Sequence, residues 1–194
     1  MQSAIELAEQ IEAMGAFRAA AIEVDAIPFD TAFRDACRQN SCGFYNRCWT
    51  CPPDAGEIDE LIARVRAYRY AVAFQTVSSL EDSYDMEGMH AAAAAHNRLT
   101  LKIQDLLSTL APESMVLGAG ACGICKTCTK PDGLPCRFPD RAILSLEACG
   151  IDVSALAKRC GLRYINGKNT VTYFGIALYE ARGPSRDQDG VSDG

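Results

Sequence analysis

The chain has 194 residues, 48% of them hydrophobic, and carries a formal net charge of -6. That length is sufficient for one domain with a buried core that needs no covalent cross-links. The negative charge, without clustered Lys and Arg, argues against sequence-independent nucleic-acid binding, which depends on basic residues that displace counterions from phosphates.

The order of apolar and polar residues predicts alternating helices and strands. In chain order we expect a helix over 2–15, a strand over 17–28, a short helix from Asp30, a helix over 57–67, a strand over 68–79, a helix over 89–110, a strand over 114–121, short helices over 141–148 and 152–160, and a strand over 170–181. This alternation is typical of an α/β protein: a single layered domain with a roughly four-stranded sheet flanked by helices, and cysteine loops at strand or helix ends. The pattern leaves open whether the sheet is parallel or mixed.

The two ends of the chain carry little structural signal. We predict that residues 1–181 form the domain and that the polar, Gly-rich segment 182–194 is disordered. Three glutamates, Glu6, Glu9 and Glu12, interrupt the apolar run that a secretory signal would need, and no run of about 18 apolar residues could span a bilayer. We therefore expect a cytoplasmic protein that does not associate with membranes. In a reducing compartment, its ten cysteines indicate metal ligands or catalytic groups more than disulfides.

Four cysteines in the second half of the chain form the strongest motif. Three of them stand two residues apart, which suits an iron-sulfur cluster because a tight loop can then offer successive thiolates to several irons. A single zinc ion would more often take two separated C-x2-C pairs or include histidine. We favour a [4Fe-4S] cluster here, with zinc, inert thiols or a regulatory disulfide as alternatives. This second group, spaced C-x2-C-x2-C-x7-C, consists of Cys122, Cys125, Cys128 and Cys136.

Four more cysteines in the first half of the chain have looser spacing. The prolines Pro52 and Pro53 follow the last of them, as a proline follows the last ligand in ferredoxins. A second [4Fe-4S] cluster is our leading interpretation, and a single zinc ion or a cluster with three protein ligands is the alternative. This first group, spaced C-x4-C-x5-C-x2-C, consists of Cys37, Cys42, Cys48 and Cys51. The two remaining cysteines, Cys149 and Cys160, are interpreted as small buried hydrophobic residues.

Three stretches, "CRQNSCGFYNRCWTCPPDAG", "CGICKTCTKPDGLPCRFPDRAILSLEACGIDV" and "YINGKNTVTYFGIALY", carry a resemblance to a known family. They resemble the signatures of a widespread prokaryotic family of cysteine-rich predicted metal-binding proteins of unknown function. The resemblance covers about residues 30–180. It implies that cysteines matching Cys37, Cys42 and Cys51 recur in the family, whereas the position of Cys48, just ahead of Trp49, is often not a cysteine. If Cys48 is dispensable, the first cluster has one iron open to an exogenous group.

Three further patterns bear on other chemistry. The glycines of "GAGACG" match a dinucleotide-binding fingerprint, but the cysteine motif follows them where that fingerprint needs a helix. His90 and His96, six residues apart on an expected helix, lie on different faces, so a two-histidine metal site is not predicted. Basic residues within the cysteine motifs, among them Arg47, Lys126 and Arg137, are either solvated or offset the negative charge of thiolate-bound clusters.

We therefore predict a protein with one or two [4Fe-4S] clusters that serves electron transfer or redox support. Ligands could swap between the clusters, as they do in two-cluster ferredoxins. The expected partner is a redox protein or a small-molecule substrate, and the sequence predicts no oligomeric state. Two alternatives remain: an enzyme that uses the open iron of one cluster, and a zinc-binding structural or interaction module.

Overall fold

The computed structural model describes residues 2–180. In chain order its helices and strands are α1 (Gln2–Ala13), β1 (Arg18–Glu23), α2 (Phe33–Arg38), α3 (Ile58–Arg66), β2 (Tyr70–Ser79), α4 (Met86–Leu110), β3 (Ser114–Leu117), α5 (Val153–Arg159) and β4 (Thr170–Tyr179). Short 3-10 turns lie at η1 (Val24–Ala26), η2 (Lys130–Asp132) and η3 (Pro139–Arg141). The predicted tail, 182–194, lies outside the described residues. None of the helices in the described part is both long and apolar enough to cross a membrane.

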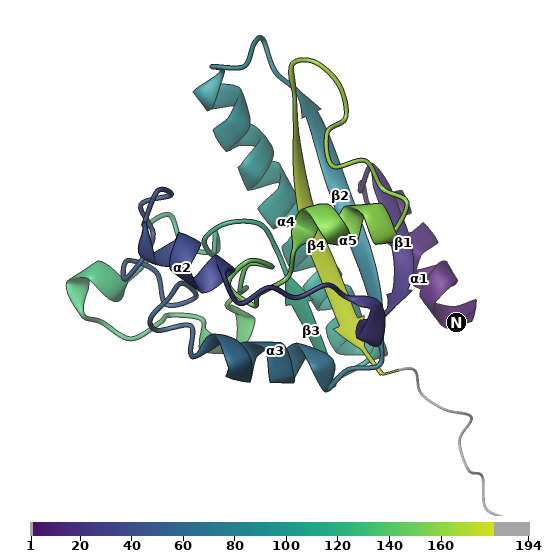
Figure 1. Cartoon of the computed structure of the whole chain (residues 1–194), viewed down its shortest axis with the longest axis horizontal. Coiled ribbons are helices and arrows are strands. Elements are labelled where there is room, and N and C mark those ends of the chain that lie inside the picture. The colour runs from purple at the N-terminus through teal and green to yellow at the C-terminus, as the bar shows by residue number, and fades with distance from the viewer. Residues whose placement is uncertain (1, 181–194) are drawn as a thin grey trace, which may run out of the picture.

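The four strands form one antiparallel sheet in the order β1-β2-β4-β3 (Figure 1). The two central strands pair along their whole lengths, from Tyr70 opposite Tyr179 to Ser79 opposite Thr170. With helices on both faces of this sheet, the protein is a single α/β domain, as the sequence predicts. The antiparallel order answers the question that the sequence pattern left open.

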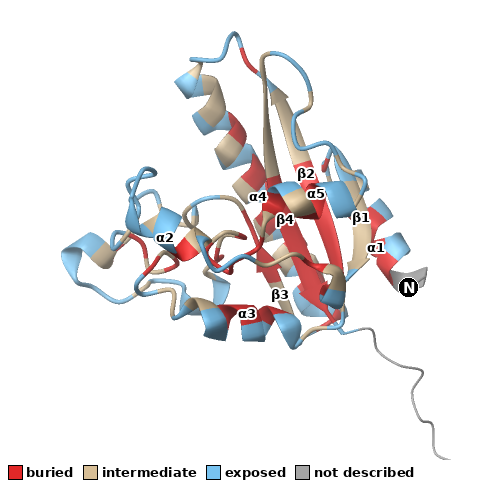
Figure 2. Ribbon diagram, viewed as in Figure 1, coloured by how far each residue is buried: buried red, intermediate tan, exposed pale blue. Residues whose placement is uncertain are grey.

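The core has two layers, one on each face of the sheet. Along β2, Val72 and Phe74 pack with α1 and α4, whereas the alternating Ala71 and Ala73 pack with α3, α5 and the segment 143–151. Buried residues fill the first half of β2 and the second half of β4, which pair with each other (Figure 2). These halves are buried on both faces of the sheet, which explains their nearly continuous apolar sequences.

Helix α4 is held at its N-terminus and at its middle. The Asp85 carboxylate caps the helix by accepting a hydrogen bond of 2.7 Å from the Gly88 N–H, so α4 begins earlier than the sequence pattern predicts. In the middle, His96 is buried, with Nδ1 2.9 Å from the Thr76 hydroxyl and Nε2 3.1 Å from the Phe174 carbonyl. Burial lowers the pKa of His96 to about 4. His96 is thus a neutral core residue that joins α4 to the sheet.

The helix predicted over 141–148 is wrong, because residues beyond η3 form an extended segment followed by turns. Gly118, just after β3, donates its N–H to the Leu144 carbonyl at 2.9 Å and accepts from the Leu146 N–H at 3.1 Å. The side chains of Leu144 and Leu146 are both buried, although residues two apart in a helix point in different directions. Burial of both leucines and the hydrogen bonds to Gly118 thus favour the extended form.

Two strands end earlier than the sequence predicts, and the chain after each of them runs into a segment with cysteines. The strand expected over 17–28 stops at Glu23 and is followed by η1. The strand expected over 114–121 stops at Leu117, so the glycines and alanines after it leave the sheet. They begin the loop that carries the second cysteine group, and no helix follows them, in agreement with the rejection of a dinucleotide site.

Candidate metal centre

Two loops carry most of the cysteines. The first cysteine loop, residues 39–57, follows α2, which itself holds Cys37. The second cysteine loop, residues 118–142, follows β3. The two loops lie side by side in a lobe beside the sheet, although about 80 residues separate them in the chain (Figure 1). The eight cysteines of both groups thus gather in one part of the molecule.

One tryptophan ties the two loops together. Trp49 Nε1 donates to the Leu134 carbonyl at 3.1 Å and lies 3.3 Å from the Thr129 hydroxyl oxygen. The Lys130 ammonium lies 4.5 Å from the centre of the Trp49 ring and forms an ion pair of 2.5 Å with Asp54. We call these contacts the loop joint. They combine a cation–π interaction with charge-assisted and neutral hydrogen bonds, and so fix the two cysteine loops relative to each other.

The first cysteine loop is shaped by tight turns. Asn40 and Asn46 adopt left-handed backbone conformations, with φ of 54° and 57°, which asparagine tolerates better than most residues. The Asn40 side chain accepts a hydrogen bond of 2.9 Å from the Tyr45 N–H, and the Asn46 N–H donates to the Pro52 carbonyl at 2.8 Å. These local bonds fold the loop back on itself, which brings its cysteines towards α2.

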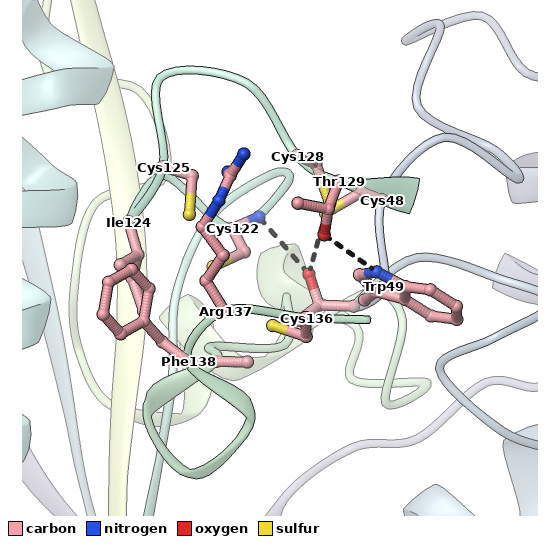
Figure 3. Close-up of a pocket in the computed structure, with 12 residues that line it drawn as sticks. Cys48, Trp49, Cys122, Ile124, Cys125, Cys128, Thr129, Cys136, Arg137 and Phe138 are labelled. Carbon is pink, nitrogen blue, oxygen red and sulfur yellow. Dashed lines mark hydrogen bonds between the residues drawn. The ribbon is translucent and has the colours of Figure 1, made fainter. Parts of the chain in front are cut away.

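A first cavity lies between the loops and is lined by five cysteines (Figure 3). Its volume is about 20 Å³, which is room for about one water molecule. The aromatic rings of Trp49 and Phe138 stand on its walls with Ile124 and Arg137. The cysteines of this five-cysteine cavity are Cys48, Cys122, Cys125, Cys128 and Cys136.

Thr50, which also lines this cavity, links the first loop to the second. Its side chain is buried, its hydroxyl oxygen lies 3.4 Å from Cys48 Sγ, and that oxygen accepts a hydrogen bond of 3.3 Å from the Cys122 N–H. The sequence offered no signal for this role, because a single threonine between cysteines has no spacing to interpret. Thr50 therefore positions Cys48 beside the second cysteine group.

A second cavity is lined by Cys37, Cys42 and Cys51 and has a volume of about 290 Å³. A water molecule needs about 10–15 Å³ on the same measure, so this three-cysteine cavity admits a group of many atoms. The remaining walls come from both loops and from the turn after η3. They are Phe44, Tyr45, Pro52, Gly120, Ala121, Ser145, Glu147 and Ala148.

The structure thus divides the first cysteine group between the two cavities. Cys37, Cys42 and Cys51 line the larger one, whereas the buried Cys48 lines the smaller one with the whole second group. Cys48 still contacts its neighbour. Their mutual hydrogen bond lowers the pKa of the Cys48 thiol to about 5 and raises the pKa of the Cys51 thiol. Cys48 and Cys51 thus contact each other although they line different cavities.

Charged groups near the three-cysteine cavity include two that sequence reasoning missed. Burial raises the pKa of the Glu147 carboxyl, which stands on the cavity wall. Burial also raises the pKa of the Cys37 thiol, while the positive charge of Arg34 opposes that shift. Arg34 is itself buried and donates to the Gly56 carbonyl at 2.8 Å. A single acid within the apolar stretch "LSLEACG" was the available signal for Glu147.

The other residues singled out from the sequence lie in different surroundings. Arg137 lines the five-cysteine cavity and donates to the Thr127 carbonyl at 3.1 Å. Arg47 is exposed, and Lys126 faces a separate cavity beside α4. Cys149 is fully buried in the core, as predicted. The partly buried Cys160 packs against the core cluster that contains Cys149.

The cysteines do not form a preset site for one ion. Within residues 2–180, no three Cys, His, Asp or Glu side chains are placed to hold a single metal ion. The cysteines are grouped instead by the cavity that each one lines.

The comparison with protein families gives one match. The profile of the family described as "Predicted metal-binding protein (DUF2284)" matches residues 20–179, which include both cysteine groups. The chain belongs to this family. Its family identity, and with it a metal-binding role, agrees with the resemblance stated above.

Comparison with individual proteins adds little. No curated protein matches the chain. Among solved structures, an epoxyqueuosine reductase from Bacillus subtilis matches with a TM-score of 0.40 and 13% sequence identity. The match covers 99% of this chain and 50% of the reductase, so this family member spans about half the length of that enzyme.

Proposed function

We propose that this protein is a redox protein with two [4Fe-4S] clusters, one with four cysteine ligands and one with three. The division of the cysteines between two cavities carries this proposal. The second group supplies four thiols to the five-cysteine cavity, and Cys37, Cys42 and Cys51 line the other. The cluster in the five-cysteine cavity would serve electron transfer, and the cluster in the three-cysteine cavity would leave one iron for a small molecule.

The residues fit such groups by their chemistry. Thiolates are the protein ligands of iron-sulfur clusters, and five cysteines line one cavity and three line the other. The three-cysteine cavity has the volume for a cluster, whereas the five-cysteine cavity must widen to take one. Widening there disturbs few packed contacts, because most residues of 131–141 are exposed.

When bound, a [4Fe-4S] cluster supplies one-electron transfer, and an iron without a protein thiolate supplies a coordination position. The chain itself supplies the surroundings. Trp49 and Phe138 cover the five-cysteine cavity and keep water from it. In the three-cysteine cavity, the Glu147 carboxyl and the Ser145 hydroxyl can orient a bound molecule, and the Glu147 carboxyl can hold or release a proton there.

Metal analysis tests the proposal. Protein purified without oxygen should be brown and contain about eight irons and about eight acid-labile sulfides per chain, since each cluster has four of each. About four irons and four sulfides per chain would mean that only one cluster is bound, and would contradict the proposal of two. Colourless protein with stoichiometric zinc and no sulfide would overturn the proposal in favour of a zinc module.

A further inference from the structure

A third cavity, which we call the α4 cavity, lies between α4 and the second cysteine loop. Its volume is about 600 Å³, within the range of sites for cofactor-sized and substrate-sized molecules. One wall is a helix surface of small residues, including Ala93 and Ala94. The opposite wall is the start of the second cysteine loop. Gly123 in this loop approaches α4 so closely that an added Cβ would lie 2.3 Å from Asn97 Nδ2.

The α4 cavity meets both cysteine cavities. Phe44, Gly120 and Ala121 line it and also line the three-cysteine cavity. Cys122 and Cys125 line it and also line the five-cysteine cavity. A molecule in the α4 cavity therefore lies beside the ligands of both proposed clusters.

The two charged side chains of this cavity are both positive. Arg98 and Lys126 line it together with His90, and no Asp or Glu does. None of the ion pairs formed within residues 2–180 involves these three side chains. This grouping contrasts with the net charge of -6 of the whole chain. Basic side chains without carboxylate neighbours, in a concave site, favour an anion, and a guanidinium pairs well with carboxylate or phosphate oxygens.

We propose that the α4 cavity binds a small molecule with a carboxylate or phosphate group, which Arg98 and Lys126 hold. The anionic end lies at these two side chains, and the rest of the molecule extends past Gly120 and Ala121 towards the three-cysteine cavity. This inference rests on the proposed function, because it assigns a substrate class to the same redox centre.

Binding of two probes, pyrophosphate and citrate, tests the inference. We expect the full chain, purified without oxygen, to bind at least one of them in calorimetric titrations at low salt. Binding should weaken by about tenfold or more in the double variant R98Q/K126Q. Lys102→Gln is the matched control, because Lys102 lines a neighbouring cavity that shares Arg98 but does not line the α4 cavity, so binding that is unchanged in Lys102→Gln argues against the neighbouring cavity. Preference for pyrophosphate would indicate a phosphate, and preference for citrate a carboxylate.

A second pair of variants blocks the α4 cavity without changing charge. Ala94→Trp should fill it and abolish binding, whereas Ala91→Trp, on an exposed part of the same helix outside the cavity lining, should not. Far-UV circular dichroism checks that α4 is intact. The inference is overturned if neither probe binds, or if R98Q/K126Q and Ala94→Trp bind as well as their controls.

Iron and sulfide contents of the same samples separate this inference from the proposed function. About eight irons and eight sulfides per chain without probe binding would contradict the anion site but not the clusters. Probe binding with the expected variant effects, in protein that lacks iron and sulfide, would contradict the cluster proposal but support the anion site.

Discussion

The two cysteine cavities use the same ligand type in different ways. In one, five cysteines line a volume of about 20 Å³ together with Trp49 and Phe138. In the other, three thiols share a volume of about 290 Å³ with Glu147 and Ser145, and the space continues into the α4 cavity. Under the proposed function, the number of thiols at each cavity, more than the number in each motif, decides which cluster is fully ligated and which has an iron for a further molecule.

The largest expected effect tests whether the two cavities hold separate metal centres, and follows the removal of one cysteine from each cavity. Cys125→Ser should remove roughly half of the iron and sulfide, and Cys42→Ser should remove the other half, because each residue lines only one of the two cysteine cavities. Iron and sulfide analysis with EPR of the reduced protein measures this. Cys160→Ser, in the core, is the control. If either ligand variant loses nearly all the iron, the two centres are not separate.

The next largest expected effect concerns the stability of the sheet core, away from the cysteine cavities, and its dependence on pH. Burial lowers the pKa of His96 to about 4 from an unfolded value of about 6.5. Since the unfolded chain then binds more protons between these values, stability is full above pH 6.5 and falls as the pH drops towards 4. This contribution amounts to about 2 kcal/mol between pH 7 and pH 5.

Urea unfolding of wild type and His96→Gln at both pH values measures that contribution. The variant should be less stable at pH 7, because it alters the hydrogen bonds to Thr76 and Phe174, but its stability should change less with pH. The exposed His90→Gln is the control. An equally steep pH dependence in His96→Gln would show that the acid sensitivity originates elsewhere, for instance among the cysteines.

A smaller effect concerns the loop joint that both cavities share. Trp49→Phe keeps an aromatic ring near Lys130 but removes the N–H donor to Leu134 and Thr129. The loss should destabilise the joint locally by about 1–2 kcal/mol. Hydrogen exchange should then accelerate in residues 129–134 while the sheet stays protected. Acceleration throughout the sheet would instead mean that the lobe and the sheet unfold together.

The smallest effect sharpens the assignment of Cys48. Because Cys48 lies beside four other thiols and outside the three-cysteine cavity, Cys48→Ser should leave the iron count nearly unchanged. Cys51→Ser is the matched comparison and should lose the three-cysteine centre. Loss of about half of the iron in Cys48→Ser would instead make Cys48 an obligatory ligand.

Local sequence patterns were enough to predict most of the fold. Alternating apolar residues indicated the four strands, and the predicted helix over 89–110 corresponds to α4. The failure at 141–148 has a non-local cause, since the hydrogen bonds of Gly118 to Leu144 and Leu146 outweigh a local helical preference.

The site was predictable only in part. Motif spacing singled out the eight cysteines that line the two cavities, because residues of one loop lie close together in the chain. Spacing could not reveal that Cys48 joins the second group, since Thr50 and Trp49 make contacts with residues more than 70 positions away. Glu147 and Arg98 were missed for the same reason: folding, rather than local sequence, brings them to cavities that cysteines also line.

Trp49 has one more consequence. It is the sole tryptophan of the chain and stands in the wall of the five-cysteine cavity (Figure 3). Intrinsic tryptophan emission from this protein therefore originates at the joint between the two cysteine loops and nowhere else. Changes in Trp49 fluorescence should therefore follow metal binding at the cysteine cavities in real time, without an added label.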